Sequence, residues 1–133
     1  MIVKIVFWIF VLAFDLLIPL LMLGFGRSFI KNPPTEINPG YGYRTTMSSK
    51  NRDTWDFAQR YMGKVWYKWG RVLLVPSFVP LLFVLGRDVG TVGVVGLVVS
   101  GMQLVVMLGS TLTTERALKK NFDKNGKRKI ETD

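Results

Sequence analysis

The sequence contains no cysteine and no histidine among its 133 residues. Without cysteine the chain can form no disulfide and has no thiolate nucleophile. Without histidine it lacks the side chain that most often serves as a general base near neutral pH, and the usual zinc ligands are missing as well. These absences exclude most familiar catalytic arrangements, so the sequence predicts no enzyme, no catalytic residue, no cofactor and no metal site.

Acidic residues are also few. Nine Asp and Glu residues stand against eighteen Lys and Arg residues, which gives a net charge of +9 and an isoelectric point near 10.1. The mean hydropathy is nevertheless +0.27, and strong positive charge in a hydrophobic chain is typical of a membrane protein. At this length we expect one small membrane domain, residues 1–133, in which a sizeable binding cavity would require a partner or a second copy.

The first hydrophobic stretch, residues 5–26, contains a single charged residue, Asp15. It is long enough to cross a hydrocarbon core of about 30 Å and predicts a first transmembrane helix. A cleaved signal peptide is the alternative, but the stretch is too long and no small-residue cleavage motif precedes Arg27. We therefore expect this helix to stay in the mature protein.

Two further uncharged stretches, residues 72–86 and 89–114, predict a second transmembrane helix at about residues 71–86 and a third at about 89–114. The former is short for a membrane span, and Pro76 and Pro80 predict that it is kinked or broken. The latter has a surface of small residues on which another helix is expected to pack closely. These residues are Gly86, Gly90, Gly93, Gly96, Ser100 and Gly101.

A basic, polar segment separates the first two hydrophobic stretches. Its prolines and glycines predict an irregular loop over residues 27–50. Residues 51–69 predict an amphipathic helix that begins at Asn51 as N-cap and carries apolar and charged residues on opposite faces. The tryptophans and tyrosines of this helix favour a position in the headgroup plane, at the cytoplasmic interface.

The distribution of charge predicts the topology. Sixteen of the eighteen basic residues lie between Arg27 and Arg71 or in the tail, residues 115–133, which we expect to fray beyond about Phe122. Because basic segments stay on the cytoplasmic side, the N-terminus is expected outside and the C-terminus inside, with three spans in an all-α membrane protein. Anionic lipid headgroups account for the basic residues, so no nucleic-acid partner is expected.

Asp15 lies near the middle of the first predicted helix, where an ionised carboxylate is costly unless it is paired, neutralised or hydrated. Matching the midpoints of residues 5–26 and 89–114 places Ser100 and Gln103 at the same depth. Two interpretations stay open. The carboxyl group of Asp15 is either a proton or ligand site, or it is neutral and fixes helix packing through a hydrogen bond to Gln103.

The segment 42–45, Gly-Tyr-Arg-Thr, places a guanidinium among hydroxyl groups at the predicted cytoplasmic face. Such an arrangement suits the binding of a carboxylate, a phosphate or a peptide carbonyl. In the structural alternative, Arg44 pairs with Glu36 or Asp53 and pins the loop to the helix that follows.

One set of polar and aromatic residues follows a recognisable spacing: Asn38, Gly42, Tyr43, Arg44, Thr45, Ser48, Asn51, Trp55 and Gly63. Over about residues 30–85 this pattern resembles the signature of the SdpI-like family of bacterial membrane proteins. The resemblance implies a multi-pass protein of the bacterial inner membrane that protects against a membrane-active peptide toxin or captures a regulatory protein. The implied binding residues are those from Asn38 to Trp55. Longer members of the family have additional membrane helices and tend to carry histidine at the position of Gln59.

Two other function classes stay open. Asp15 and Gln103, with a broken second membrane helix, would suit a small oligomeric transporter or channel for protons or solutes. Asp53, Asp56 or Glu36 would serve an enzyme as acid or base, but no nucleophile or orienting group accompanies them. A homo-oligomer is a further expectation that the sequence leaves open.

Overall fold

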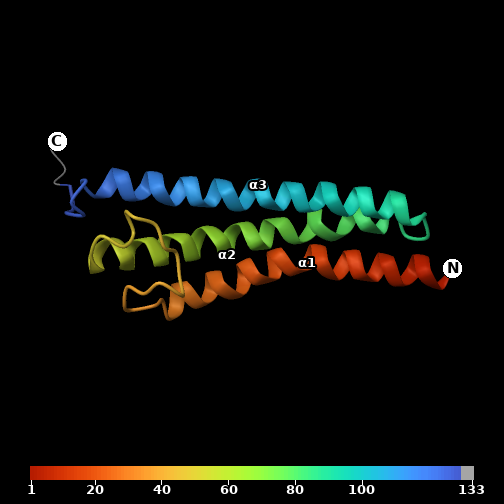
Figure 1. Ribbon diagram of the computed structural model, residues 1–133, viewed down its shortest axis with the longest axis horizontal. Helices are drawn as coiled ribbons and strands as arrows, with labels where there is room; N and C mark the ends of the chain where they lie inside the picture. Colours follow the sequence, from red (N-terminus) through yellow and green to blue (C-terminus); the bar gives the residue numbers. More distant parts are fainter. Residues whose placement is uncertain (130–133) are drawn as a thin grey trace.

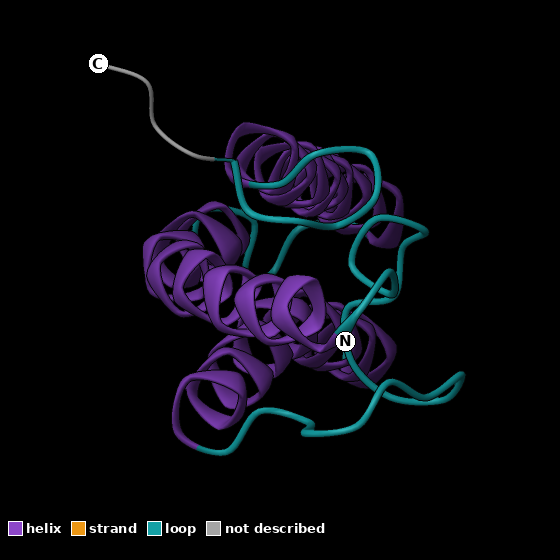
Figure 2. Cartoon of the chain, turned by 90° about the vertical axis from the view of Figure 1, so that its left-hand side faces the viewer, coloured by secondary structure: helices purple, strands orange, loops and turns teal. Residues whose placement is uncertain are grey.

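Three long helices dominate the structure. The computed structural model describes residues 1–129, in which α1 spans Ile2–Lys31, α2 spans Arg52–Leu82 and α3 spans Val89–Asn121. The helices run up, down and up, with the α1–α2 loop and the C-terminal tail at one end and the N-terminus at the other (Figure 1). The view along the bundle shows helices packed on one another with loops at the periphery (Figure 2). The described residues contain no β-sheet, and the predicted all-α fold is confirmed.

Among the described residues, two helices, α1 and α3, are long and apolar enough to cross a membrane. The α2 helix is less apolar because its basic residues extend as far as Arg71. The guanidinium of Arg71 packs over the ring of Tyr67, 4.5 Å from the ring centroid, and thus turns back toward the N-terminal end of α2. The third span and the orientation of the chain stay predictions.

The α2 helix corrects the prediction of two separate helices at residues 51–69 and 71–86. It is continuous through Pro76 and Pro80, and it runs alongside α1 and α3 rather than across their ends (Figure 1). Its buried apolar residues include Trp55, Ala58, Met62, Leu73 and Leu81. The apolar face of residues 51–69 therefore packs inside the bundle, and these residues do not form a separate helix. Their position relative to the headgroup plane stays a prediction.

Two helix ends lie beyond their predicted limits. The α1 helix continues past residue 26 to Lys31, because Phe29 is buried against α2, and the loop predicted at residues 27–50 is correspondingly shorter. The α3 helix continues past residue 114 because Leu118 and Phe122 belong to a buried cluster with residues of α2. In both cases the burial of apolar side chains extends the helix into a segment that its charged residues predicted to be a loop or a tail.

The main chains of α1 and α2 approach each other at three glycines. A Cβ atom at Gly26 would lie 2.6 Å from the main-chain nitrogen of Tyr67, and one at Gly70 would lie 3.0 Å from the main-chain nitrogen of Leu23. Gly63 faces Gly26 across the same interface. The two helices therefore touch main chain to main chain, which maximises dispersion contacts.

The predicted small-residue face of α3 is used only in part. A Cβ atom at Gly96 would lie 2.5 Å from the side chain of Val11, whereas one at Gly101 would have no neighbouring atom within 4 Å. Side-chain hydrogen bonds hold much of α3 instead, as where the Trp66 indole donates to the Ser110 hydroxyl at 2.9 Å. Helix packing through glycine is thus mainly a property of the α1–α2 pair.

The prediction that the tail frays beyond about Phe122 is wrong for the described residues, because residues 122–128 form a tight turn. Phe122 is buried and pairs with Arg128 in an isolated antiparallel bridge. The guanidinium of Arg128 lies 5.0 Å from the ring centroid of Phe122. The rest of the predicted tail, residues 130–133, lies outside the described residues.

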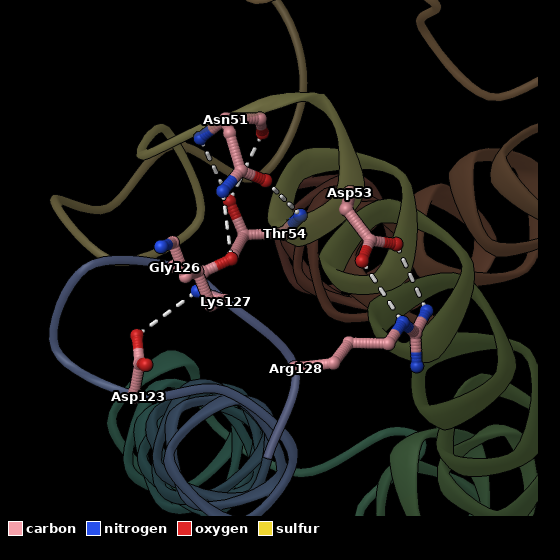
Figure 3. Close-up of polar contacts among 7 residues, drawn as sticks. All are labelled: Asn51, Asp53, Thr54, Asp123, Gly126, Lys127 and Arg128. Carbon is pink, nitrogen blue, oxygen red and sulfur yellow. Dashed lines mark hydrogen bonds and ion pairs between the residues drawn. The ribbon is translucent and has the colours of Figure 1, made fainter. Parts of the chain in front are cut away.

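This turn is attached to the first residues of α2 (Figure 3). The Asn51 side chain donates to the main-chain oxygen of Gly126 at 2.7 Å. Arg128 makes two parallel bonds of 2.9 Å to the Asp53 carboxylate, a bidentate geometry that is stronger than a single contact. The beginning of α2 and the end of the described chain therefore form one unit.

We predict that Gly26→Ala destabilises the protein by about 1–3 kcal/mol, because the added methyl group would overlap the main chain of α2. Gly24→Ala is the matched control, since a Cβ atom there would have no neighbour within 4 Å. Alanine favours helix over glycine, so the control should be neutral or stabilising by up to about 1 kcal/mol. Denaturant unfolding of the purified variants in detergent measures both values, and equal effects would contradict the proposed packing.

Candidate functional site

The segment between α1 and α2 folds over one end of the bundle, where a cavity of about 520 Å³ is formed. Residues 40–45 lie at the loop end of the cavity, and all three helices contribute to its walls. The helix residues are Ile18, Leu21, Met22, Phe25, Phe29, Met62, Trp66, Met107 and Thr111. The size suits a small-molecule or side-chain ligand, and residues of a single chain line it. The expected partner or second copy stays a prediction.

Asn38 and Arg44 shape the tip of the loop. The Asn38 carboxamide oxygen accepts from the main-chain nitrogens of Gly40 at 3.0 Å and Tyr41 at 2.6 Å, an Asx turn that fixes the direction of the chain. The exposed Arg44 guanidinium donates to the main-chain oxygen of Pro39. One Arg44 nitrogen therefore holds the loop, and Arg44 also lines the cavity.

The structural alternative for Arg44, an ion pair with Glu36 or Asp53, is not formed. Asp53 is paired with Arg128, and this is the one ion pair found within residues 1–129. The Arg44 guanidinium is thus available to an incoming carboxylate or carbonyl group.

Gln59 of α2 attaches the loop to that helix through two hydrogen bonds. Its carboxamide, which is fully buried, accepts from the main-chain nitrogen of Tyr43 and donates to the main-chain oxygen of the same residue, both at 2.7 Å. The preceding Gly42 has a φ of +107°, and a Cβ atom there would lie 2.8 Å from the Gln59 oxygen. A side chain at residue 42 would be strained at this φ and would collide with Gln59, so only glycine fits there. The Gln59 carboxamide bonds the N–H and the oxygen of Tyr43 as a neighbouring main-chain segment would.

The Tyr43 side chain joins the loop to α3. It is buried, and its hydroxyl donates to the Glu115 carboxylate at 2.6 Å. Burial raises the pKa of the Tyr43 phenol, and the neighbouring Glu115 carboxylate raises it further. The loop is therefore connected to α2 by Gln59 and to α3 by Tyr43.

The loop is also stabilised by three residues that do not line the cavity: Ser48, Asn51 and Trp55. The Ser48 hydroxyl accepts from the main-chain nitrogen of Thr45 at 2.8 Å, and Asn51 forms a capping box with Thr54 at the start of α2. Trp55 is fully buried, and its indole donates to the Pro34 main-chain oxygen at 2.8 Å. These side chains position the loop without reaching the cavity.

The structure therefore divides the predicted binding residues into two groups. Four line the cavity: Gly42, Tyr43, Arg44 and Thr45. Four do not: Asn38, Ser48, Asn51 and Trp55. Sequence reasoning missed Gln59, Trp66 and Glu115, although a glutamine between Ala58 and Met62 on the apolar face of a helix was a usable signal.

Asp15, Ser100 and Gln103 lie together in the middle of the bundle, at the matched depth. The Ser100 hydroxyl donates to the Asp15 carboxylate at 2.9 Å. Gln103 donates instead to the Asp15 main-chain oxygen at 2.5 Å and to the Ser77 hydroxyl at 2.9 Å, so it connects all three helices. Pro19 explains the first bond, because a proline has no N–H to bond the main-chain oxygen four residues earlier. Whether the cluster is a functional site stays a prediction.

Within residues 1–129, no group of three Asp or Glu side chains is arranged to hold a metal ion. A sequence model of the SdpI/YfhL protein family matches residues 35–114, in agreement with the resemblance noted in the loop. The matched range contains all eight predicted loop residues and Gln59 but excludes α1. Comparison with curated proteins and with solved structures gives no significant match.

We predict that Gln59→Leu releases the loop, because it leaves the buried main-chain N–H of Tyr43 without an acceptor and its oxygen with only the 3.2 Å bond from Ser48. The expected loss of stability is about 1–3 kcal/mol, the cost of one buried unpaired group. Hydrogen exchange over residues 40–48 should accelerate. The control is Arg60→Leu at the adjacent, exposed position of α2, and similar exchange in both variants would argue against the role of Gln59.

Tyr43 should make stability depend on pH in the alkaline range. Because the pKa of the phenol is raised above its ordinary value of 10.0, the folded state holds this proton more tightly than the unfolded state. The contribution of the hydroxyl is therefore present below pH 10.0 and is lost as the pH rises toward the pKa of the folded state.

We expect Tyr43→Phe to cost about 1–2 kcal/mol at pH about 8, with a difference from the wild type that shrinks above pH about 10. Unfolding free energies of both proteins across this range measure the effect. Tyr41→Phe, at an exposed position, controls for general effects of tyrosine titration. A difference that stays constant with pH would contradict the prediction.

Proposed function

Because the chain belongs to the SdpI/YfhL protein family, we propose that it is a membrane protein of the immunity type that binds a membrane-active peptide toxin. Family membership and two apolar helices support a membrane protein. The observation that carries the proposed binding is the cavity beneath residues 40–45, where an apolar space meets an available guanidinium. The proposed action is binding without covalent chemistry.

The chemistry of the cavity suits an amphipathic peptide. Phe25, Phe29 and Trp66 offer aromatic surface, and two methionines, Met22 and Met107, provide side chains that adapt to different ligands. At the loop end the guanidinium of Arg44 suits a carboxylate or a peptide carbonyl group. A peptide that inserts into membranes carries both parts, an apolar side chain and an exposed main-chain or terminal group.

The proposed topology places the loop end at the cytoplasmic face of the bacterial inner membrane. All three helices would cross the bilayer, with the N-terminus outside, and the basic residues of the loop and tail would contact anionic headgroups. The position of Arg71 supports this arrangement, because its guanidinium turns toward the loop end and away from the apolar end of α2. A regulatory protein or a second copy of the chain would have access to the exposed surface of the loop.

In this mechanism the protein captures the toxin before it can act on the bilayer. The apolar part of the peptide would enter between α1 and α3, where Leu21 and Phe25 are exposed at the side of the cavity. The polar part would stay beside Arg44 at the level of the headgroups. Holding the peptide there lowers the free concentration that is available to assemble in the membrane.

The test is the survival of a sensitive bacterium that expresses the protein and is challenged with a panel of membrane-active peptides. Wild-type protein should protect against at least one peptide. Arg44→Ala removes the guanidinium, and Leu21→Trp fills the cavity, so each should reduce protection at least about tenfold, equivalent to the loss of about 1.4 kcal/mol of binding.

Two control variants should protect like the wild type at equal membrane abundance. Lys50→Ala removes a loop charge that does not line the cavity, and Leu20→Trp adds the same bulk beside Leu21 but outside the lining. Full protection by Arg44→Ala and Leu21→Trp would move the binding site away from the cavity. No protection against any peptide, despite confirmed expression, would contradict the immunity function.

A further inference from the structure

A second cavity lies between α1 and α3, nearer to the N-terminus of α1. Its volume is about 310 Å³, and its surface is almost entirely apolar. One wall carries Phe7, Phe10 and Phe14 from α1, while Gly93 and Gly96 of α3 leave space on the other side. This cavity is separate from the one beneath the loop, since the two share no lining residue.

The cavity is bordered by the carboxyl group of Asp15, which is 1% exposed. One of its oxygens accepts from Ser100, but the other, Oδ2, has no hydrogen-bond partner within residues 1–129. Oδ2 is itself buried, so a ligand reaches it only where the neighbouring side chains shift. On the α3 side its neighbour is Gly96, where a Cβ atom would lie 3.6 Å from this oxygen. A buried polar atom without a partner is costly and indicates an interaction that is completed by a ligand.

The surroundings identify the chemistry of that ligand. The rings of Phe10 and Phe14 are stacked, with centroids 6.4 Å apart, and they line the same cavity as Asp15. Aromatic faces and a carboxylate together attract an ammonium group, and the apolar remainder of the cavity suits a hydrocarbon chain. Asp15 is the only titratable residue that lines the cavity, and its other neighbours across the bundle, Ser77, Ser100 and Gln103, are neutral.

We propose that this cavity binds a lipophilic primary amine whose nitrogen pairs with Oδ2 of Asp15. The amine enters from the bilayer in its neutral form, and the carboxyl group is also neutral before binding, so no isolated charge has to enter the apolar region. The carboxyl proton then passes to the amine nitrogen. The resulting ammonium group donates a hydrogen bond to Oδ2, and its charge faces Phe10 and Phe14.

The experiment measures thermal unfolding of the full-length protein in a nonionic detergent, with decylamine or with decan-1-ol. Decylamine should raise the unfolding temperature of the wild type by roughly 5 °C near saturation, because a ligand that binds only the folded state stabilises it. Decan-1-ol has the same chain without the basic nitrogen and should give a much smaller shift. Asp15→Asn keeps the acceptor for Ser100 and should abolish the difference between the two ligands.

A second variant, Gly93→Leu, fills the cavity while leaving Asp15 intact, and it should also abolish the shift. Arg44→Ala, in the loop cavity, should retain it. Equal stabilisation of the wild type and Asp15→Asn would overturn the proposal, as would an effect of decan-1-ol as large as that of decylamine. The absence of any shift in the wild type would overturn it as well.

Discussion

The main-chain contact between α1 and α2 determines the shape of the rest of the molecule. Gly26, Gly63 and Gly70 allow the two helices to meet without intervening side chains. The α3 helix has only one comparable position, Gly96, and is otherwise held by larger side chains and hydrogen bonds. Space therefore remains between α1 and α3, and both cavities lie in that space.

Several polar side chains in the bundle form hydrogen bonds to main-chain groups of another helix or of the loop. Gln103 bonds the main-chain oxygen that Pro19 leaves unpaired, and Gln59 bonds both main-chain groups of Tyr43. Trp8 does the same at the C-terminal end of α2, where its indole donates to the main-chain oxygen of Leu81 at 2.7 Å. Where water is excluded, such side chains supply hydrogen-bond partners to main-chain N–H and C=O groups that have no partner within a helix.

The sequence predicts the helical fold and the depth of Asp15 correctly, because long apolar runs and matched midpoints depend only on helix rise. It does not predict the continuity of α2, since Pro76 and Pro80 normally interrupt a helix and only tertiary packing shows that they are tolerated. The loop motif includes four residues that line the cavity, but spacing cannot distinguish Arg44, which lines it, from Trp55, which is buried behind the loop. That distinction requires knowledge of which side chains are buried.

The attachment of the tail to α2 has a consequence for biosynthesis. Asn51 caps α2 and also holds the main-chain oxygen of Gly126, while Asp53 holds Arg128. During translation Asn51 and Asp53 are made well before Gly126 and Arg128, so the contacts between α2 and the tail can form only after synthesis has passed residue 128. The start of α2 therefore gains its last contacts only after the whole of α3 has been made.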